Sequence, residues 1–197
     1  MPPNNRPELV LASQSPYRRA LLEKLGLRVR CRPADIDESP LPQETPAKTA
    51  LRLAEEKARA LAPYEPNALI IAGDQLAELD GNALGKPLTT ANARDQLSRC
   101  SGKSVVFHTA LCLLNSATGQ SRQLIDPVVV NFRPLSRTYI DAYLEKEDVL
   151  DCAGSFKCEG LGICLFESIQ ANDPNTLQGL PLIQLITLLQ AENYSLF

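Results

Sequence analysis

The sequence predicts a mixed α/β fold in which a central sheet, flanked by helices, carries a cleft. Three observations support this class: short apolar segments alternate with amphipathic helical ones, no segment repeats, and no GxGxxG fingerprint occurs. With 197 residues, of which 44% are hydrophobic, the chain is long enough to bury a core of its own. We expect residues 1–7 to be a disordered tail and residues 8–197 to form a single domain.

The chain is predicted to open with a buried strand over residues 8–12 and a helix from Pro16 to about Gly26. Proline suits the first turn of a helix, where its missing N–H has no partner to lose, and glycine is typical of a helix end. A second strand over residues 28–32 then leads into an acidic, proline-rich surface loop over residues 33–46.

A long helix is predicted over residues 46–61, opened by Thr45 and Pro46. Its apolar residues form one stripe at helical spacing, made up of Ala50, Leu51, Ala54, Ala58 and Leu61. Lys57 lies at the edge of this stripe. Its ammonium either extends to solvent or enters a cleft beside the core, and both readings stay open.

An isoleucine-rich buried strand, ALIIAGDQ, is predicted to end at the polar residues Gly73, Asp74 and Gln75. Asp74 is the carboxylate of greatest interest, because the strand fixes its position at a sheet edge and Gly73 allows a ligand to approach closely. The alternative role for this carboxylate is that of a turn or cap residue.

The remaining predicted elements are a hairpin turning at Asp80–Gly81, a helix over residues 90–101, two long strands within residues 103–132, a helix up to residue 147, a strand over residues 163–169 and a helix over residues 182–190. Ser136 is placed to cap the second of these helices. The glycine-rich segment CAGSFKCEGLG, residues 152–162, precedes the last strand.

Charge and hydropathy argue against several classes of function. The formal net charge of -3 gives no global basic field, so we expect no nucleic-acid partner. No apolar run approaches the roughly 20 residues of a membrane-spanning helix, and MPPNNRPE lacks the apolar core of a secretion signal. A cytoplasmic protein without a membrane partner is therefore expected.

The metal-binding side chains do not form a zinc pattern. The six cysteines include no C-x-x-C pair, and His108 is the only histidine. We expect no zinc site, and thiols that are reduced and mostly buried.

Polar residues gather at the start of the first helix. Ser13, Ser15 and the free N–H groups of the first turn meet where the helix dipole favours an anion, and Arg18 and Arg19 add positive charge. A phosphate site is one reading of this cluster. An ordinary capped helix with solvated arginines is the other.

Three lysines from separate segments, Lys57, Lys86 and Lys157, offer further positive charge, although each alone is typical of a solvated surface. A triphosphate carries about four negative charges near neutral pH, so its pocket needs several such groups together with a divalent cation. Glu38, in the acidic loop, is a candidate ligand of that cation.

Five segments, in this order, resemble the Maf family of nucleoside triphosphate pyrophosphatases: LASQSPYRR, IIAGDQ, GKPLT, CAGSFKCEGLG and DPNTLQGLP. The resemblance extends from about Glu8 to Gln190. It implies an elongated mixed sheet with a deep central cleft, often in a homodimer, and a divalent cation, Mg or Mn. It also implies conversion of a nucleoside triphosphate into its monophosphate and pyrophosphate.

The resemblance also implies roles for individual residues. By motif position, Asp74 resembles the family's proton acceptor and, with Glu38, its metal site. The catalytic group would be Asp74, Lys57 and Lys86, and substrate would be bound by Ser13, Ser15, Arg18 and Lys157. Cys158 departs from the pattern, since serine is expected there.

Base preference is implied by three further residues. Tyr17, Gln75 and Glu159 resemble the branch that acts on 7-methyl-GTP, whereas the branch acting on dTTP and UTP usually has threonine after the aspartate. Two other functions stay open, a dTTP/UTP pyrophosphatase of the same family and a non-catalytic module that binds a cap-like nucleotide. The presence of Asp74, Lys57 and Lys86 together favours catalysis.

Overall fold

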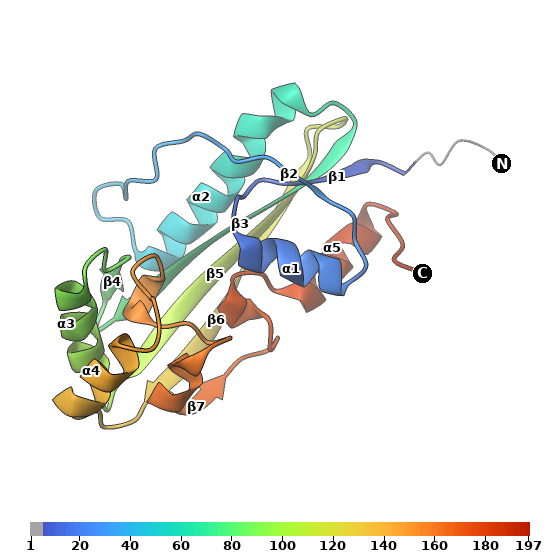
Figure 1. Ribbon diagram of the computed structural model, residues 1–197. Coiled ribbons are helices and arrows are strands. Elements are labelled where there is room, and N and C mark those ends of the chain that lie inside the picture. The colour runs from blue at the N-terminus through green and yellow to red at the C-terminus, as the bar shows by residue number, and fades with distance from the viewer. Residues whose placement is uncertain (1–5) are drawn as a thin grey trace.

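The computed structural model describes residues 6–197, which build one seven-stranded mixed sheet with helices on both faces (Figure 1). The strands are β1 (Glu8–Leu11), β2 (Arg30–Cys31), β3 (Ala68–Leu79), β4 (Asn82–Leu84), β5 (Ser104–Asn115), β6 (Ser121–Phe132) and β7 (Phe166–Gln170). Their order is β2-β1-β3-β5-β6-β7, with β4 beside β3. The predicted α/β class is confirmed, while residues 1–5 of the predicted tail lie outside the described residues.

The three long strands β3, β5 and β6 form the antiparallel centre of the sheet. β5 pairs with β3 from Asn115 to Val106 and with β6 from Ser104 to Leu114. β1 extends the sheet by pairing in parallel with both β3 and β2. Side chains of successive residues on β3 therefore point alternately to the two faces of the sheet.

The helices are α1 (Pro16–Lys24), α2 (Pro46–Leu61), α3 (Thr90–Cys100), α4 (Arg137–Leu144) and α5 (Leu182–Ala191). α2 covers one face of the sheet through its predicted apolar stripe, whereas α1 and α5 cover the other face (Figure 1). The side chains of Thr45, Thr89 and Ser136 cap α2, α3 and α4 by accepting main-chain N–H groups. None of these helices is long and apolar enough to cross a membrane.

A separate aromatic core lies near α3 and α4, where β7 joins the sheet. The ring of Phe156 packs edge-to-face against three other rings, with centroid distances of 5.2 Å to Phe107, 5.8 Å to Phe132 and 4.7 Å to Phe166. Edge-to-face packing of this kind is favourable beyond the area that it buries. The segment just before Lys157 is thereby attached to β5, β6 and β7.

The predicted end of the third strand at Asp74 is wrong. β3 continues to Leu79, because its pairing with β5 runs on to the pair Glu78–Val106 and β4 joins its other edge from Ala77. The predicted hairpin is confirmed at Asp80–Gly81, where both residues have the positive φ angles of a tight turn.

Two further expectations need correction. Residues 163–165 belong to a 3-10 helix, Leu161–Leu165, so the last strand begins only at Phe166. All six cysteines are free thiols, as expected, but only Cys100 and Cys112 are buried. The thiols are therefore not mostly buried.

Candidate active site

The candidate site lies where one edge of β3 has no neighbouring strand. On that edge β1 pairs with β3 only as far as Leu11–Ile71, and β4 joins only from Leu84–Ala77 onward. Between these pairs, and within residues 6–197, the segment that contains Asp74 has a strand partner on one side alone, which is β5. We call this interruption, residues 72–76 of β3, the open edge.

Lys57 reaches from α2 to the carboxylate of Asp74. Its Nζ atom lies 2.6 Å from Asp74 Oδ1 and 2.6 Å from Glu38 Oε1. Lys57 is only 7% exposed and Asp74 only 9%, so this pair is screened less by water than a surface pair would be. The reading in which the ammonium of Lys57 extends to solvent is therefore wrong, while the cleft of the other reading stays a prediction.

The loop that carries Glu38 is held against α2 by Arg52. Arg52 of α2 donates to the main-chain carbonyl of Ser39 at 3.0 Å and forms an ion pair with Glu44 at 2.8 Å. The hydrogen bond with Arg52 lowers the pKa of Glu44 to about 2. The loop residue next to Glu38 is thus tied to the helix that carries Lys57.

The start of α1 gathers the residues predicted to bind an anion. Ser15 Oγ accepts the N–H of Arg18 at 3.3 Å, and Ser13 Oγ accepts from Ser15 N at 3.0 Å and from Arg18 Nη1 at 3.4 Å. Burial lowers the pKa of the Arg18 guanidinium, while the negative charges of Asp74 and Glu38 oppose this shift. Arginine nevertheless keeps its charge in proteins, so Arg18 contributes positive charge beside the acidic pair.

The missing side chain of Gly73 leaves room for Arg18 and for the main chain of two other segments. A Cβ atom at Gly73 would lie 3.0 Å from the carbonyl oxygen of Ala110, 3.6 Å from Arg18 Nε and 3.6 Å from the carbonyl oxygen of Gly179. Arg18 Nε donates to that same Gly179 carbonyl at 2.9 Å. Protein atoms therefore fill the space that a side chain at this position would take, and the close approach of a ligand to the main chain of Gly73 stays a prediction.

Tyr17 lies within electrostatic reach of both Lys157 and Glu159. Burial raises the pKa of the Tyr17 phenol; the charge of Lys157 opposes this shift and the charge of Glu159 reinforces it. Tyr17 and Lys157 are half-buried, whereas Glu159 is exposed. The aromatic residue in the first turn of α1 is thus brought together with the glycine-rich segment.

Cys158 keeps a polar contact at the position where serine was expected. Its thiol donates to Glu159 Oε2 at an Sγ–Oε2 distance of 3.2 Å. Burial, together with this hydrogen bond, raises the pKa of the thiol to about 12, so it stays protonated at neutral pH. The departure from the family pattern leaves a donor beside Glu159.

Lys86 is exposed, but the main chain on both sides of it is held by α3. Gln96 Nε2 donates to the carbonyl of Gly85 at 3.0 Å, and Asn92 Nδ2 donates to the carbonyl of Pro87 at 2.9 Å. Neither Asn92 nor Gln96 is part of a recognisable sequence motif, and sequence reasoning missed both.

Gln75 points to the face of the sheet opposite to Asp74. Its Nε2 atom lies 2.7 Å from Thr109 Oγ1, 3.2 Å from the carbonyl of Thr176 and 3.3 Å from that of Leu177. The side chain is thus engaged with the turn before α5, and the structure does not bring it together with Lys57 and Asp74. Its role in base selection stays a prediction.

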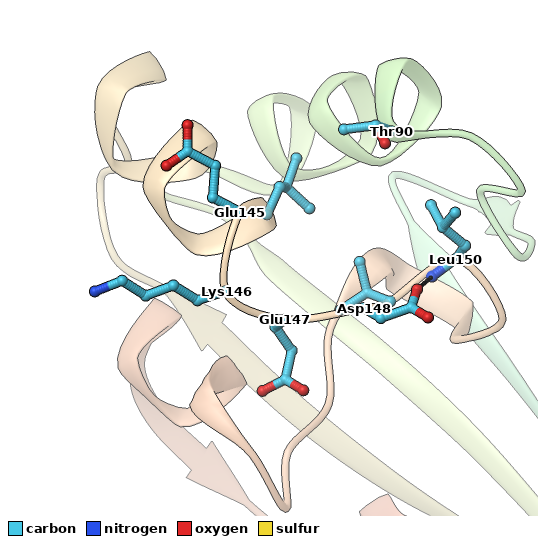
Figure 2. A pocket seen from close by; sticks show the side chains of 8 residues that line it. Thr90, Glu145, Lys146, Glu147, Asp148 and Leu150 are labelled. Carbon is cyan, nitrogen blue, oxygen red and sulfur yellow. Dashed lines mark hydrogen bonds between the residues drawn. The ribbon is translucent and has the colours of Figure 1, made fainter.

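Two surface cavities lie elsewhere. One, of about 340 Å³, lies between Thr90 at the start of α3 and residues 144–150, where Figure 2 shows Glu147 pointing away from Thr90. The other, of about 480 Å³, is lined by residues including Pro134 and Tyr139. Neither is lined by a predicted site residue, so the convergence of charges at the open edge, rather than a cavity volume, locates the candidate site. The deep central cleft stays a prediction.

Two carboxylates of the site suit a divalent cation. Within residues 6–197, no three His, Cys, Asp or Glu side chains gather in a metal-binding arrangement. Glu38 and Asp74 nevertheless both contact one ammonium, so two hard oxygen donors converge on one point. Mg²⁺ in nucleotide sites commonly takes one or two carboxylates and completes its shell with water and substrate phosphates, so the donor set fits.

The chain is similar to members of a known protein family. The family model described as "Maf-like protein" matches residues 8–192. A curated 7-methyl-GTP pyrophosphatase from Nitrosococcus oceani is 50% identical over 188 residues, which cover 95% of this chain and 94% of that protein.

Two solved structures share the fold. A HAM1 protein from Coxiella burnetii matches with a TM-score of 0.50 at 19% identity, over 93% of this chain and 98% of that one. The Staphylococcus aureus Ham1 protein matches with a TM-score of 0.52 at 16% identity, over 94% of this chain and 99% of that one. At these identities the likeness concerns the fold alone.

Proposed function

The chain belongs to the Maf-like protein family, and we propose on that basis that it hydrolyses 7-methyl-GTP to 7-methyl-GMP and pyrophosphate. Such a hydrolase would remove a modified nucleotide from the nucleotide pool, and we place it in the cytoplasm. The observation that carries the proposal is the cluster of Lys57, Asp74 and Glu38 at the open edge, with Arg18 beside it. We further propose that residues 8–197 act as one domain.

Hydrolysis requires a water molecule to attack the α-phosphorus. The new bond joins the water oxygen to this phosphorus, the bond to the bridging oxygen of the β-phosphate breaks, and its electron pair leaves with pyrophosphate. We assign Asp74 as the group that orients the water and accepts its proton. The contact of 2.6 Å with Lys57 holds the direction of the carboxylate.

Positive charge around the phosphates supplies most of the expected rate enhancement, because phosphoryl transfer depends chiefly on positioning and electrostatics. We assign Arg18, Lys57, Lys86 and Lys157 to the triphosphate, with Ser13 and Ser15 as hydroxyl partners. Glu38 and Asp74 would hold Mg²⁺ or Mn²⁺, which when bound supplies Lewis-acid polarisation of the α-phosphate.

The base would be recognised through its charge. Methylation at N7 makes guanine cationic, and a cation over an aromatic ring gains about 0.5–2 kcal/mol, depending on its exposure to water. Tyr17 offers such a ring, and the carboxylate of Glu159 offers an acceptor for the N1 and N2 protons of guanine. The electrostatic link of Tyr17 with both Lys157 and Glu159 supports one shared pocket.

The direct test is a panel of nucleotides assayed for pyrophosphate release with Mg²⁺ or Mn²⁺. We expect 7-methyl-GTP to be the best substrate. Release from dTTP or UTP alone would transfer the protein to the other branch of the family. Tight binding of 7-methyl-GTP without release of pyrophosphate would contradict the proposal and indicate a non-catalytic binding module.

Replacing Glu159 by glutamine should lower selectivity for 7-methyl-GTP over GTP by about 10-fold, or about 1.4 kcal/mol, because it removes the charge that favours a cationic base. Tyr17→Leu should act in the same direction by removing the ring face. The measurement is the ratio of kcat/KM values for the two nucleotides. Glu145→Gln, an exposed change at the cavity of Figure 2, is the matched control. Unchanged ratios in both site variants would leave only a pyrophosphatase of unknown base preference.

Lys57→Ala and Lys86→Ala should each lower kcat/KM by about 10-fold or more, and by the same factor for 7-methyl-GTP and GTP, because both lysines are assigned to phosphates. Lys48→Ala, an exposed change on the same helix as Lys57, is the control. Steady-state kinetics with the two nucleotides decide the matter. A loss confined to one base would move that lysine to the base pocket.

A further inference from the structure

Gln96 of α3 connects the two segments that carry Lys86 and Lys157. Its Nε2 atom donates to the carbonyl of Gly85 at 3.0 Å, and its Oε1 atom accepts the hydroxyl of Ser155 at 2.6 Å. Gly85 immediately precedes Lys86, and Ser155 lies two residues before Lys157. One side chain thus contacts the main chain beside one lysine and the loop beside the other.

The chemistry of these contacts fixes the orientation of the amide. A main-chain carbonyl can only accept a hydrogen bond, so the NH₂ group of Gln96 must face Gly85. Its oxygen then faces Ser155, whose hydroxyl donates. Few side chains satisfy both contacts at once, because they need a donor and an acceptor on one terminal group.

The Ser155 contact is made at a turn whose backbone conformation is uncommon. Gly154 and Ser155 have φ angles of 78° and 63°, a region that is uncommon for a residue other than glycine. Ser155 is fully buried, so its hydroxyl needs a partner, and Gln96 supplies it. The turn Ala153–Ser155 packs against α3, which keeps the loop beside the helix.

Asn92, one turn earlier on the same face of α3, donates to the carbonyl of Pro87 at 2.9 Å. The helix therefore holds Lys86 from both sides and holds the start of the Lys157 loop with the same face. Lys86 itself is exposed, so its position depends on these main-chain contacts of its two neighbours.

We propose that Gln96 is a positioning residue that sets Lys86 and Lys157 at the spacing needed to bind one triphosphate. This inference rests on the proposed function, because it assigns both lysines to phosphates. Gln96 itself touches neither substrate nor reacting atoms, and it acts through the two segments that it joins.

The test is equilibrium binding of inorganic tripolyphosphate, measured by calorimetry with Mg²⁺ present, combined with a mutant cycle. Gln96→Leu should weaken binding by about 10-fold in the native background, because misplaced charges lose much of their effect. In a protein that also carries Lys86→Ala and Lys157→Ala, the same change should weaken binding by less than about 2-fold, since the lysines it positions are absent. An effect of equal size in both backgrounds would mean a merely structural role and would overturn the inference.

Ser155→Gly is a second variant, which tests the same contact in case Gln96→Leu fails to fold. Glycine accepts the positive φ angle more readily than serine does, so the fold is retained while the contact with Gln96 is lost. This variant should reproduce the weaker binding of Gln96→Leu. Ser98→Ala is the matched control, because Ser98 is exposed on α3 and its hydroxyl bonds only within that helix.

The outcomes separate the two proposals. Native protein that binds tripolyphosphate while both Gln96→Leu and Ser155→Gly bind it equally well would overturn the positioning role alone. Native protein that fails to bind tripolyphosphate and releases no pyrophosphate from 7-methyl-GTP would overturn the proposed function and the inference with it.

Discussion

Asp74→Asn is expected to lower turnover of 7-methyl-GTP by at least about 100-fold while leaving the fold intact. Asparagine has nearly the same shape, but it cannot accept the proton of the attacking water and offers no negative charge to a cation. Lys57 keeps Glu38 as its partner at 2.6 Å, so its ammonium does not become an isolated buried charge. The measurement is kcat by pyrophosphate release, with thermal unfolding followed in parallel.

Asp80→Asn is the matched control for this experiment. Asp80 is exposed at the β3–β4 turn, where it pairs with Lys103 at 2.6 Å and has a φ angle of 52°. Asparagine tolerates this conformation well, so neither turnover nor stability should change appreciably. A folded Asp74→Asn protein with near-normal turnover would falsify the assignment of Asp74 as the proton acceptor.

Phe156→Ala is expected to lower the free energy of unfolding by about 3–5 kcal/mol, the usual cost of deleting a buried aromatic ring. The ring is 5% exposed and packs against three other phenylalanine rings, so its removal leaves a cavity that the rigid strands beneath it cannot easily fill. Urea unfolding followed by circular dichroism measures the loss. At a temperature where the variant remains folded, binding of tripolyphosphate should also weaken, because Phe156 precedes Lys157.

Phe197→Ala provides the comparison, since this phenylalanine is fully exposed at the C-terminus. Its removal should change the free energy of unfolding by no more than about 0.5 kcal/mol. If Phe156→Ala lost less than about 1 kcal/mol, the three remaining rings would have to repack around the gap, and the attachment of the Lys157 loop to the aromatic core would need another explanation.

Much of the local structure follows from patterns a few residues long. Pro16 and Thr45 mark helix starts, Asp80–Gly81 marks a hairpin, and each is where the structure has it. The apolar stripe of α2 also anticipated which face of that helix is buried. These features depend on backbone sterics and on side-chain periodicity, both of which a single sequence carries.

The arrangement around Asp74 depends instead on residues that are distant in sequence. Asp74 lies within a strand because β5 continues to pair with β3 beyond it, and no property of the segment ALIIAGDQ reports that pairing. The resemblance implies a role for Gln75 in base preference, whereas in the structure its amide contacts Thr176, about a hundred residues further on. Gln96 gave no signal, because a glutamine on a half-exposed helix face is ordinary until the segments beside it are known.

The open edge of β3 also bears on self-association. Ala12 N donates to the carbonyl of Ile71 at 2.8 Å, so the main-chain groups of Ile71 point to the edge where β1 pairs. Because the main-chain groups of every second residue in a strand point to the same edge, those of Gly73 and Gln75 point to the open edge as well. A free sheet edge normally invites pairing with a strand of another molecule, which leads to aggregation. Here the interruption spans only residues 72–76 and is closed at both ends by β1 and β4, while Arg18 lies over Gly73. The interruption is therefore too short and too enclosed for another polypeptide to add a strand beside Asp74.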